Sequence, residues 1–566
     1  MSSAHARPVS ASGTARLRRA ASSHVGAYLG FQLVSLTLFG RGVLRDPTNT
    51  VVGSYGGDQG VFIWSLAWWP HAIAHGLDPL STDRVFAPDG WNLAWTSVIC
   101  GPALVLAPVT ETLGPTVSFN VLALAAPALA AFSAYLLARE LVGSRAGAIS
   151  AGLLFGFGSY LSSQTINHLN LALVFPIPLA VLLVVRHVRG TIGDRRFVFS
   201  LALCLIAQLL TFLETALTLA IFGTLALGLA ALVADARTRA GLRRTAPRLA
   251  AAALVALAVT SPYLIAALVR GNPIEAGVRG RDYPVDAANL LTPTFAQAFN
   301  PFGLDASRLA TNATEQTAFL GPVLLLVVAL AVCLLWGRRT TRLLLAFSAA
   351  VLICALGARL TWYGSPGVAL PWSLVADLPL IRHAFPARFP VYLWLALALL
   401  AAQVMAVLPR PLLIALAAGL VLTLLPSTRE SVWSTRLATP AFFEDGRWRS
   451  AIRPNENVLI VPFSYLGSSM LWQERAGFAF RQTGGYVSAT IPGMIAAYPL
   501  TAALYGGPLP ARPELELRRF LCGREVAAVI APIGLGGALV GLFDEVLGSG
   551  EAHDGVRVWR TPACTG

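Results

Sequence analysis

The sequence contains no lysine and little charge of any kind. Charged residues make up 12% of its 566 residues, which is about half the share in an ordinary globular chain. Hydrophobic residues make up 55%, and the mean hydropathy is +0.65. A composition this poor in charge excludes a disordered chain and a cytosolic enzyme. It leaves a polytopic membrane protein as the class to consider.

Cysteine is also scarce. The chain has six cysteines, without a Cys-x-x-Cys pair or a His/Cys cluster, so it is no disulfide scaffold and shows no zinc pattern. Four of them lie in or near apolar segments, where we expect them to pack: Cys100, Cys204, Cys333 and Cys354. An oxidising exterior permits a disulfide between Cys522 and Cys564, and the sequence leaves open whether it forms.

All basic side chains other than histidine are arginine, and 42 basic against 28 acidic residues give a net charge of +14. With abundant Ala, Gly and Leu, this bias is typical of a GC-rich, actinobacteria-like genome. The arginines fall between apolar runs, which indicates membrane topology and not nucleic-acid binding.

Eleven apolar segments reach or approach the roughly 20 residues that cross a bilayer. They are 22–40, 116–138, 147–163, 169–185, 197–212, 215–234, 249–269, 318–336, 343–357, 389–408 and 411–426. The run 197–234 is too long for one span, so we expect a turn near Thr211–Thr215. The short piece 96–110, with Pro102 and Pro108, is predicted to be a re-entrant or interfacial helix; a twelfth span is the alternative.

Arginine gives the orientation. Residues 1–21 form a basic tail, which is predicted to lie in the cytoplasm before an uncleaved first span. Alternating spans then place the arginine-rich loops inside, and the short turns predicted outside hold almost no arginine. Large outer loops are expected at 41–115, 270–317 and 358–388. No internal repeat argues for a transporter built from inverted halves.

The last part of the chain loses the long apolar runs. Strand-like stretches occur at 457–463, 525–532 and 556–560, with helical patterns between them. The fold class predicted is therefore an α-helical polytopic membrane protein, with about eleven transmembrane helices in residues 22–427. A C-terminal extracytoplasmic α/β domain is expected over 428–566.

The first outer loop holds a candidate catalytic carboxylate. A helix is predicted over 58–76, and its tryptophans suit a position at the membrane surface. Asp58, after Gly56-Gly57, begins this helix. It is either an N-cap or a functional carboxylate at the outer edge of the bilayer that accepts a proton or binds a metal.

Three further polar points lie far apart in the sequence. His168 and Asn170 follow the third predicted span, and Glu214 stands at the outer turn of the run 197–234. Arg382, His383 and Arg388 precede the tenth span, where arginine suits phosphate binding. Each point has a structural alternative. His168 could form hydrogen bonds at the membrane interface, Glu214 could extend its carboxylate to the membrane surface, and the arginines could anchor the chain at the membrane.

The predicted topology places Asp58, His168, Glu214 and Arg388 on one outer face. A lipid-linked donor keeps its chain in the bilayer and its phosphate at this surface. We expect the carboxylate to deprotonate an acceptor hydroxyl, and Arg388 to neutralise the leaving phosphate, with a divalent metal ion as a possible but unknown cofactor.

The chain resembles the GT-C superfamily of bacterial multi-span membrane glycosyltransferases. The resemblance lies in Gly57-Asp58 followed by IWSLAWW, in APDGWNLAW, in His168-Leu169-Asn170, in PARF, and in the stretch WQERAGFAFRQTGGY. It implies an inverting hexosyl- or pentosyltransferase with a polyprenyl-phosphate sugar donor, an active site on the outer face, and Asp58 as the base. Many relatives carry a second acidic residue beside the base; Gln59 follows Asp58 here, and Asp46 is a rival.

If this resemblance holds, the C-terminal domain helps to bind a glycan or lipid acceptor. Trp472, Arg481 and Tyr486 are the predicted acceptor contacts, and Arg388, Arg382 and His168 the predicted donor-phosphate ligands, lined by Asn170, Glu214 and His383. Alternatively, the three predicted acceptor contacts are structural residues of the domain. A transporter or lipid flippase, and a non-catalytic membrane scaffold, are the competing functions. The expected partners are the lipid-linked donor, the acceptor and the lipids of a bacterial plasma membrane, without nucleic acid.

Overall fold

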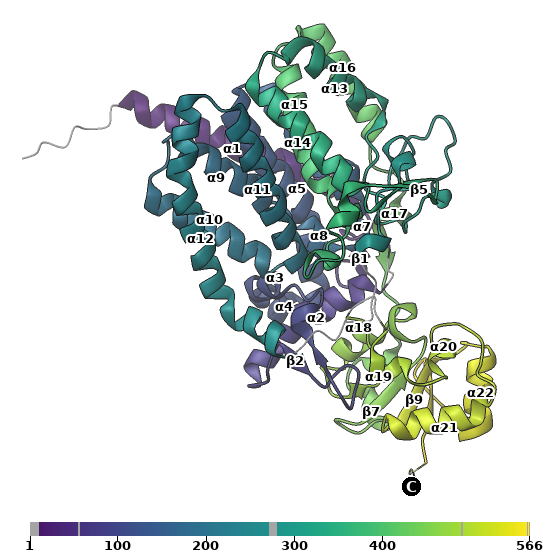
Figure 1. Ribbon diagram of the computed structural model, residues 1–566. Coiled ribbons are helices and arrows are strands. Elements are labelled where there is room, and N and C mark those ends of the chain that lie inside the picture. Colours follow the sequence, from purple (N-terminus) through teal and green to yellow (C-terminus); the bar gives the residue numbers. More distant parts are fainter. Residues whose placement is uncertain (1–10, 55–56, 271–279, 488–490, 563, 565–566) are drawn as a thin grey trace, which may run out of the picture.

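The computed structural model describes residues 11–54, 57–270, 280–487, 491–562 and 564. A helical body forms the larger part of the molecule, and a smaller unit with a β-sheet lies at one end of it (Figure 1). Every predicted apolar segment of the body is helical. The helices are α1 (Ala11–Phe39), α5 (Pro115–Val142), α6 (Arg145–Phe157), α7 (Ser159–Asn167), α8 (Leu169–Ala172), α9 (Pro176–Val188), α10 (Asp194–Leu209), α11 (Leu213–Val233), α12 (Ala236–Val269), α13 (Gly321–Leu335), α14 (Arg339–Ala355), α15 (Pro390–Met405) and α16 (Arg410–Leu424). The whole of the basic tail predicted at 1–21 lies outside the residues whose side chains are described.

Five helical stretches in the described residues are long and apolar enough to cross a membrane: Pro115–Val142, Leu169–Val188, Leu213–Val233, Ala236–Val269 and Pro386–Met405. Shorter apolar helices lie at His24–Phe39, Gly321–Leu335 and Arg410–Leu424. A multi-pass membrane protein is therefore supported, whereas the count of eleven spans stays a prediction. The turn expected near Thr211–Thr215 is confirmed, because α10 ends at Leu209 and α11 begins at Leu213.

Small residues let three helices of the body approach closely. A Cβ added at Gly147 of α6 would lie 2.6 Å from the carbonyl oxygen of Ala402 in α15. A Cβ at Gly156 would lie 2.5 Å from the carbonyl oxygen of Pro127 in α5. Helices that pack in a membrane favour such residues, since backbone contact replaces the hydrophobic driving force. The span ending in α15 is 94% buried over its most apolar stretch, so it lies at the centre of the body.

The first predicted outer loop fills the space between the body and the smaller unit (Figure 1). It contains β1 (Thr50–Val52), α2 (Asp58–Ala74), β2 (Ser81–Thr82), β3 (Trp91–Asn92), α3 (Cys100–Val105) and α4 (Ala107–Leu113). Neither α3 nor α4 approaches the roughly 20 residues of a span, which agrees with a re-entrant or interfacial piece at 96–110.

The position expected for α2 is wrong, although the helix itself is confirmed. Trp64 and Trp68 are buried and do not lie half wet at the membrane surface. Trp64 Nε1 donates to Gln473 Oε1 over 2.8 Å, and Gln473 belongs to α18 (Ser469–Arg475) of the smaller unit. The polar edge of the indole thus finds a protein partner, and α2 joins the body to the unit.

The smaller unit is built on a five-stranded mixed sheet in the order β10-β11-β9-β7-β8. The strands are β7 (Asn457–Ile460), β8 (Arg481–Gln482), β9 (Ala528–Pro532), β10 (Glu551–His553) and β11 (Val556–Arg560). β7 runs parallel to both β8 and β9, and β11 runs antiparallel to β9. All three strand-like stretches of the sequence therefore carry strands. The helices around the sheet include α19 (Gly493–Ala496), α20 (Thr501–Leu504), α21 (Pro513–Gly523) and α22 (Ala538–Leu547).

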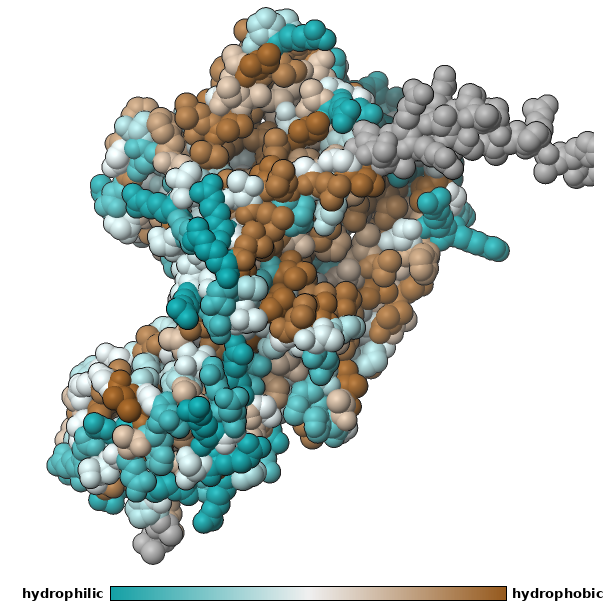
Figure 2. All heavy atoms as spheres, turned by 180° about the vertical axis from the view of Figure 1, so that it is seen from behind, coloured by the Kyte–Doolittle hydropathy of each residue, from teal (hydrophilic) through white to brown (hydrophobic). Residues whose placement is uncertain are grey.

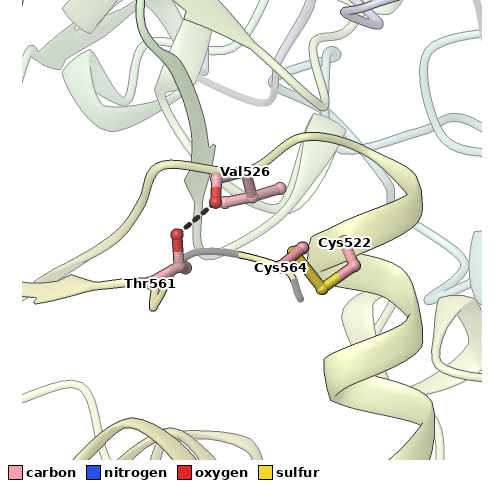
Figure 3. The surroundings of a disulfide bond; sticks show 4 residues. All are labelled: Cys522, Val526, Thr561 and Cys564. Atoms are coloured by element: carbon pink, nitrogen blue, oxygen red, sulfur yellow. Dashed lines mark hydrogen bonds between the residues drawn. A yellow bond between two sulfur atoms is a disulfide. The ribbon is translucent and has the colours of Figure 1, made fainter. Parts of the chain in front are cut away.

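Two connections complete the arrangement. β6 (Ser434–Arg436), after the short helix α17 (Glu430–Trp433), pairs with β1, and β4 (Arg359–Trp362) pairs with β5 (Ser365–Ala369) in a hairpin of the third predicted outer loop. Cys522 and Cys564 form a disulfide that ties the chain end to α21, beside a hydrogen bond from Thr561 to the carbonyl of Val526 (Figure 3).

Surface hydropathy separates the two parts of the molecule. Figure 2 shows apolar residues over much of the helical body and predominantly hydrophilic residues over the smaller unit. A bilayer around the body covers the apolar surface, whereas the hydrophilic unit suits water. The side of the membrane on which the unit lies stays a prediction.

Candidate functional site

Asp58 is the first residue of α2, and the backbone before it is held close to the smaller unit. Gly57 has φ of 88°, a conformation that glycine adopts without strain. A Cβ at Gly57 would lie 3.2 Å from Cα of Tyr465. Gly57 occupies the N-cap position, and no side chain of the described residues caps the helix. The interpretation of Asp58 as an N-cap is therefore wrong, and its carboxylate is available for other contacts.

The carboxylate of Asp58 contacts His168. His168 Nε2 lies 3.3 Å from Asp58 Oδ2, and His168 Nδ1 lies 2.7 Å from Oε1 of Gln164. Because the Gln164 oxygen only accepts, the hydrogen of that bond belongs to Nδ1. Nε2 then faces a second acceptor, so the contact is satisfied when a proton lies between His168 and Asp58. The structure confirms that these two predicted residues meet.

Tyr486 of the smaller unit completes the surroundings of Asp58. Its hydroxyl donates to the Asp58 carboxylate, and burial together with the negative charge of Asp58 raises the pKa of Tyr486 far above its ordinary value. The phenol therefore stays protonated and remains a donor. Tyr465, whose ring centroid lies 6.0 Å from that of Tyr486, borders the same place. The body and the smaller unit both contribute to this group.

Arg388 is bound by two buried carboxylates. Its Nε and Nη2 donate to Glu315 Oε1 over 3.0 and 2.6 Å, and its Nη1 donates to Glu214. Glu214 also accepts from the backbone N–H of Phe385 over 2.8 Å. The side chains of Glu315 and Arg388 are 2% and 18% exposed. Glu214 lies in the first turn of α11 and Arg388 lies two residues before α15, so these two residues, which were predicted to share a face, are in contact.

Electrostatic interaction joins the two groups. Burial alone would raise the pKa of Glu315, but the Arg388 guanidinium and then the His168 ring hold it below its ordinary value. Tyr486 interacts with the charges of both Asp58 and Arg388. We give one name, the Asp58–Arg388 group, to the following six residues: Asp58, His168, Glu214, Glu315, Arg388 and Tyr486. It holds three carboxylates against one arginine and one histidine, which leaves an excess of negative charge.

Sequence reasoning missed Glu315 and Gln164. Glu315 lies in the second predicted outer loop, directly after Asn312-Ala313-Thr314. A signal was present, because Glu315 is an acidic residue within six residues of the apolar helix α13. Gln164 lies one helical turn before His168 and could have been found by that spacing.

Three further predicted site residues lie outside the Asp58–Arg388 group. Arg382 is exposed and its Nε lies 3.2 Å from Nε2 of His383, whose pKa is lowered by burial and by the Arg382 charge. Asn170 is buried, and its Oδ1 has no hydrogen-bond partner among the described residues. These three residues form no hydrogen bond or ion pair with Asp58 or Arg388 in the described chain.

Two of the predicted acceptor contacts, whose role stays a prediction, bind other parts of the protein. Trp472 is buried, stacks on Phe443 at 5.0 Å and donates to the carbonyl of Ala438 over 3.2 Å. Arg481 donates to the carbonyl of Asn455 over 3.0 Å. Their side chains are therefore occupied by contacts with other parts of the protein. Tyr486 alone of the three contacts the Asp58–Arg388 group.

A resident divalent metal ion does not fit the residues present. Such an ion takes several oxygen or nitrogen ligands, and Asp58 and His168 supply two. The described residues hold no group of three or more His, Cys, Asp or Glu side chains that could bind a metal. The rival carboxylate Asp46 accepts from the backbone and the side chain of Asn49 in a local turn.

Comparisons with known proteins place the fold. A family model described as "Domain of unknown function (DUF6311)" matches residues 28–425. The arabinofuranosyltransferase AftD from Mycobacteria is similar in structure with a TM-score of 0.59 and 13% identity, over 96% of this chain and 40% of that one. The present chain thus spans well under half of AftD.

An archaeal enzyme gives a second likeness. The oligosaccharyltransferase AglB from Archaeoglobus fulgidus, solved in complex with an inhibitory peptide and a dolichol-phosphate, has a TM-score of 0.53 and 12% identity, over 90% of this chain and 69% of that one. No protein in a search of curated proteins matches the chain. Both structures are GT-C glycosyltransferases, so the predicted GT-C fold is confirmed.

Proposed function

The chain belongs to the family described as a domain of unknown function (DUF6311), and we propose for it the activity of a membrane glycosyltransferase. In this proposal the protein moves a sugar from a polyprenyl-phosphate donor to a hydroxyl of a cell-envelope glycan or lipid at the outer face. The observation that carries the proposal is the contact of Asp58 with His168 and Tyr486 beside Arg388. The dolichol-phosphate bound to AglB, which shares the fold, supports a lipid-linked donor.

Asp58 is the proposed general base. As the acceptor hydroxyl attacks the anomeric carbon of the donor sugar, its proton passes to Asp58, and the bond between that carbon and the phosphate oxygen breaks. Attack from the face opposite the phosphate inverts the anomeric configuration. The hydrogen bond from Tyr486 and the contact with His168 orient the carboxylate.

The leaving phosphate is proposed to meet His168 and Arg388. His168 borders the proposed base, with Nε2 3.3 Å from Asp58 Oδ2 and Nδ1 2.7 Å from Gln164 Oε1. Three of the five N–H groups of Arg388 donate to Glu214 and Glu315, so two N–H groups are left for a phosphate. The charge of Arg388 is outweighed by its two carboxylate partners, so we propose that Arg388 mainly orients the phosphate. The exposed Arg382 is proposed to contact the donor phosphate as it enters the site.

The experiment uses the purified full chain in lipid nanodiscs with a panel of polyprenyl-phosphate sugars and envelope acceptors, with and without a divalent ion. Asp58→Asn is expected to lower the transfer rate by at least about 100-fold, as the loss of a general base does. The matched control is Asp46→Asn, which makes the same change in the same loop and is expected to keep the rate.

Four results would count against the proposal. A folded Asp58→Asn protein with the full transfer rate removes Asp58 as the base. Lack of transfer from every donor by the parent protein, with movement of the lipid across the bilayer, supports the flippase alternative. Lack of both supports the scaffold. If a reagent that does not cross the membrane labels the C-terminal unit only from the cytoplasmic side, the proposed reaction lies on the wrong side of the membrane.

A further inference from the structure

A cavity of about 310 Å³ lies in the smaller unit, on the edge of its sheet formed by β10 and β11. The 3-10 helix η9 (Arg447–Ser450) and the segment after it form the other wall. The lining residues are Arg449, Ser450, Ala451, Ile452, Arg453, Glu551, His553, Val558 and Arg560. Three arginines from two separate parts of the chain thus meet around one hollow.

Two of these arginines form no salt bridge in the described chain, although the charge of Arg453 helps Arg560 to lower the pKa of Glu456. Arg560 is paired with Glu456 through Nη1–Oε2 and Nη2–Oε1 distances of 2.7 and 2.8 Å. Arg449 and Arg453, in contrast, form no ion pair with any described residue. The single carboxylate of the lining, Glu551, has its side chain 83% exposed and lies 3.4 Å from His553. The cavity is therefore cationic.

The exposed guanidinium of Arg449 packs on its sequence neighbour Trp448. It lies over the ring of the buried Trp448, with Cζ 4.5 Å from the ring centroid. A Cβ at Gly446 would lie 2.0 Å from Nη1 of Arg449, so glycine leaves the room that the guanidinium occupies. Arg560 is likewise oriented, by Glu456 and by a hydrogen bond to the carbonyl of Ala451. A guanidinium that is already oriented loses less conformational entropy on binding an anion than a freely moving one does.

The cavity lies away from the Asp58–Arg388 group. The opposite edge of the sheet, β8, faces the first predicted outer loop, because Gln482 N donates to the carbonyl of Arg84 over 3.0 Å. In the space-filling view the smaller unit is mainly hydrophilic (Figure 2). A water-borne ligand therefore fits this cavity better than a lipid headgroup.

We propose that this cavity binds an acidic sugar residue of a glycan, by its carboxylate or its phosphate group. Arginine recognises both groups through paired hydrogen bonds. None of the residues of this site belongs to the Asp58–Arg388 group, so the site goes beyond the transfer chemistry, while the choice of a sugar as its ligand rests on the proposed function.

The test measures binding of glucuronate and of glucose 6-phosphate to the full chain at constant ionic strength, with glucose as the neutral sugar. The two acidic sugars separate the carboxylate from the phosphate. Arg449→Gln combined with Arg453→Gln is expected to weaken binding of the preferred sugar by at least about ten-fold. The matched control, Arg518→Gln with Arg519→Gln, removes two exposed arginines from α21 of the same unit and is expected to leave binding unchanged.

Gly446→Ala offers a second variant that keeps every charge. The added methyl displaces the Arg449 guanidinium, and it also strains the backbone because Gly446 has φ of 74°. Binding is expected to weaken, and the unfolding temperature measures the cost of the strain. Equal loss in the cavity and control variants, equal binding of glucose, or binding to anionic vesicles but to neither acidic sugar would overturn the proposal. Measurement in an Asp58→Asn background keeps the result separate from the fate of the glycosyltransferase proposal, since acidic-sugar binding is expected to persist there.

Discussion

Two ionic groups tie helices of the body together, and their charges are balanced in opposite ways. In one, Glu140 near the end of α5 receives hydrogen bonds from Arg186 of α9 and from Arg189, at 2.8 and 3.1 Å. One carboxylate thus faces two arginines. In the other, Arg388 faces the two carboxylates Glu214 and Glu315. The same residue types therefore give an excess of positive charge at one place and of negative charge at the other.

Burial separates the groups further. The side chain of Arg186 is 43% exposed, whereas that of Glu315 is 2% exposed. Water screens the charges of the first group, so its ion pairs contribute little to the free energy of unfolding, as is usual for pairs at a protein surface. The second group holds its charges against the cost of desolvation, which is the pattern of a functional site more than of a stabilising one. Three variants test this contrast, beginning with the largest expected effect.

Arg388→Gln removes the cation that two buried carboxylates share. Unfolding of the full chain in detergent is expected to require roughly 3–5 kcal/mol less, because Glu214 and Glu315 are left buried without their partner. Denaturant unfolding followed by tryptophan fluorescence measures the change. Adding Glu315→Gln removes one of the stranded charges and is expected to restore part of the loss. A loss no larger than that of Arg186→Gln would erase the difference between the two groups.

Glu474 sharpens the comparison, because it is buried without the partners of the Asp58–Arg388 group. It lies in α18 with its side chain 10% exposed, and Arg475 Nε is 3.8 Å away. Burial raises the pKa of Glu474 from 4.5 to about 7. Below about pH 4.5 the folded and unfolded states are both neutral at this residue. As pH rises the unfolded state ionises first, so the free energy of unfolding falls until about pH 7 and is then constant.

Glu474→Gln is expected to remove this decline. The gain in stability over the parent chain is near zero at acid pH and reaches at most roughly 3 kcal/mol above neutrality. Unfolding curves across this pH range measure it. Glu514→Gln, the same change at an exposed residue of α21, serves as the control with a difference that does not vary in this way. A gain for Glu474→Gln that is equally large at acid pH would contradict the assignment to burial.

The sequence could predict the membrane helices and four members of the site, but not how the site is held together. Long apolar runs locate spans because a bilayer demands them, and the arginine pattern put Asp58, His168, Glu214 and Arg388 on one face. Burial of Glu315 arises from packing beneath Arg388, which no local pattern encodes. For Trp64, an indole suits a membrane surface or a buried hydrogen bond equally well, and its partner Gln473 lies 409 residues away.

Arg186→Gln gives the smallest expected effect and completes the contrast. Glu140 keeps its contact with Arg189, and the lost pair is partly solvated, so the free energy of unfolding should fall by less than about 1 kcal/mol. The sugar-transfer rate should match that of the parent chain, because this pair lies on α5 and α9 and contacts no member of the Asp58–Arg388 group. High salt should reduce even this small difference, since exposed pairs are screened. A loss of several kcal/mol that persists in salt would mean that the solvated group also carries buried charge, and charge balance would then no longer distinguish the two.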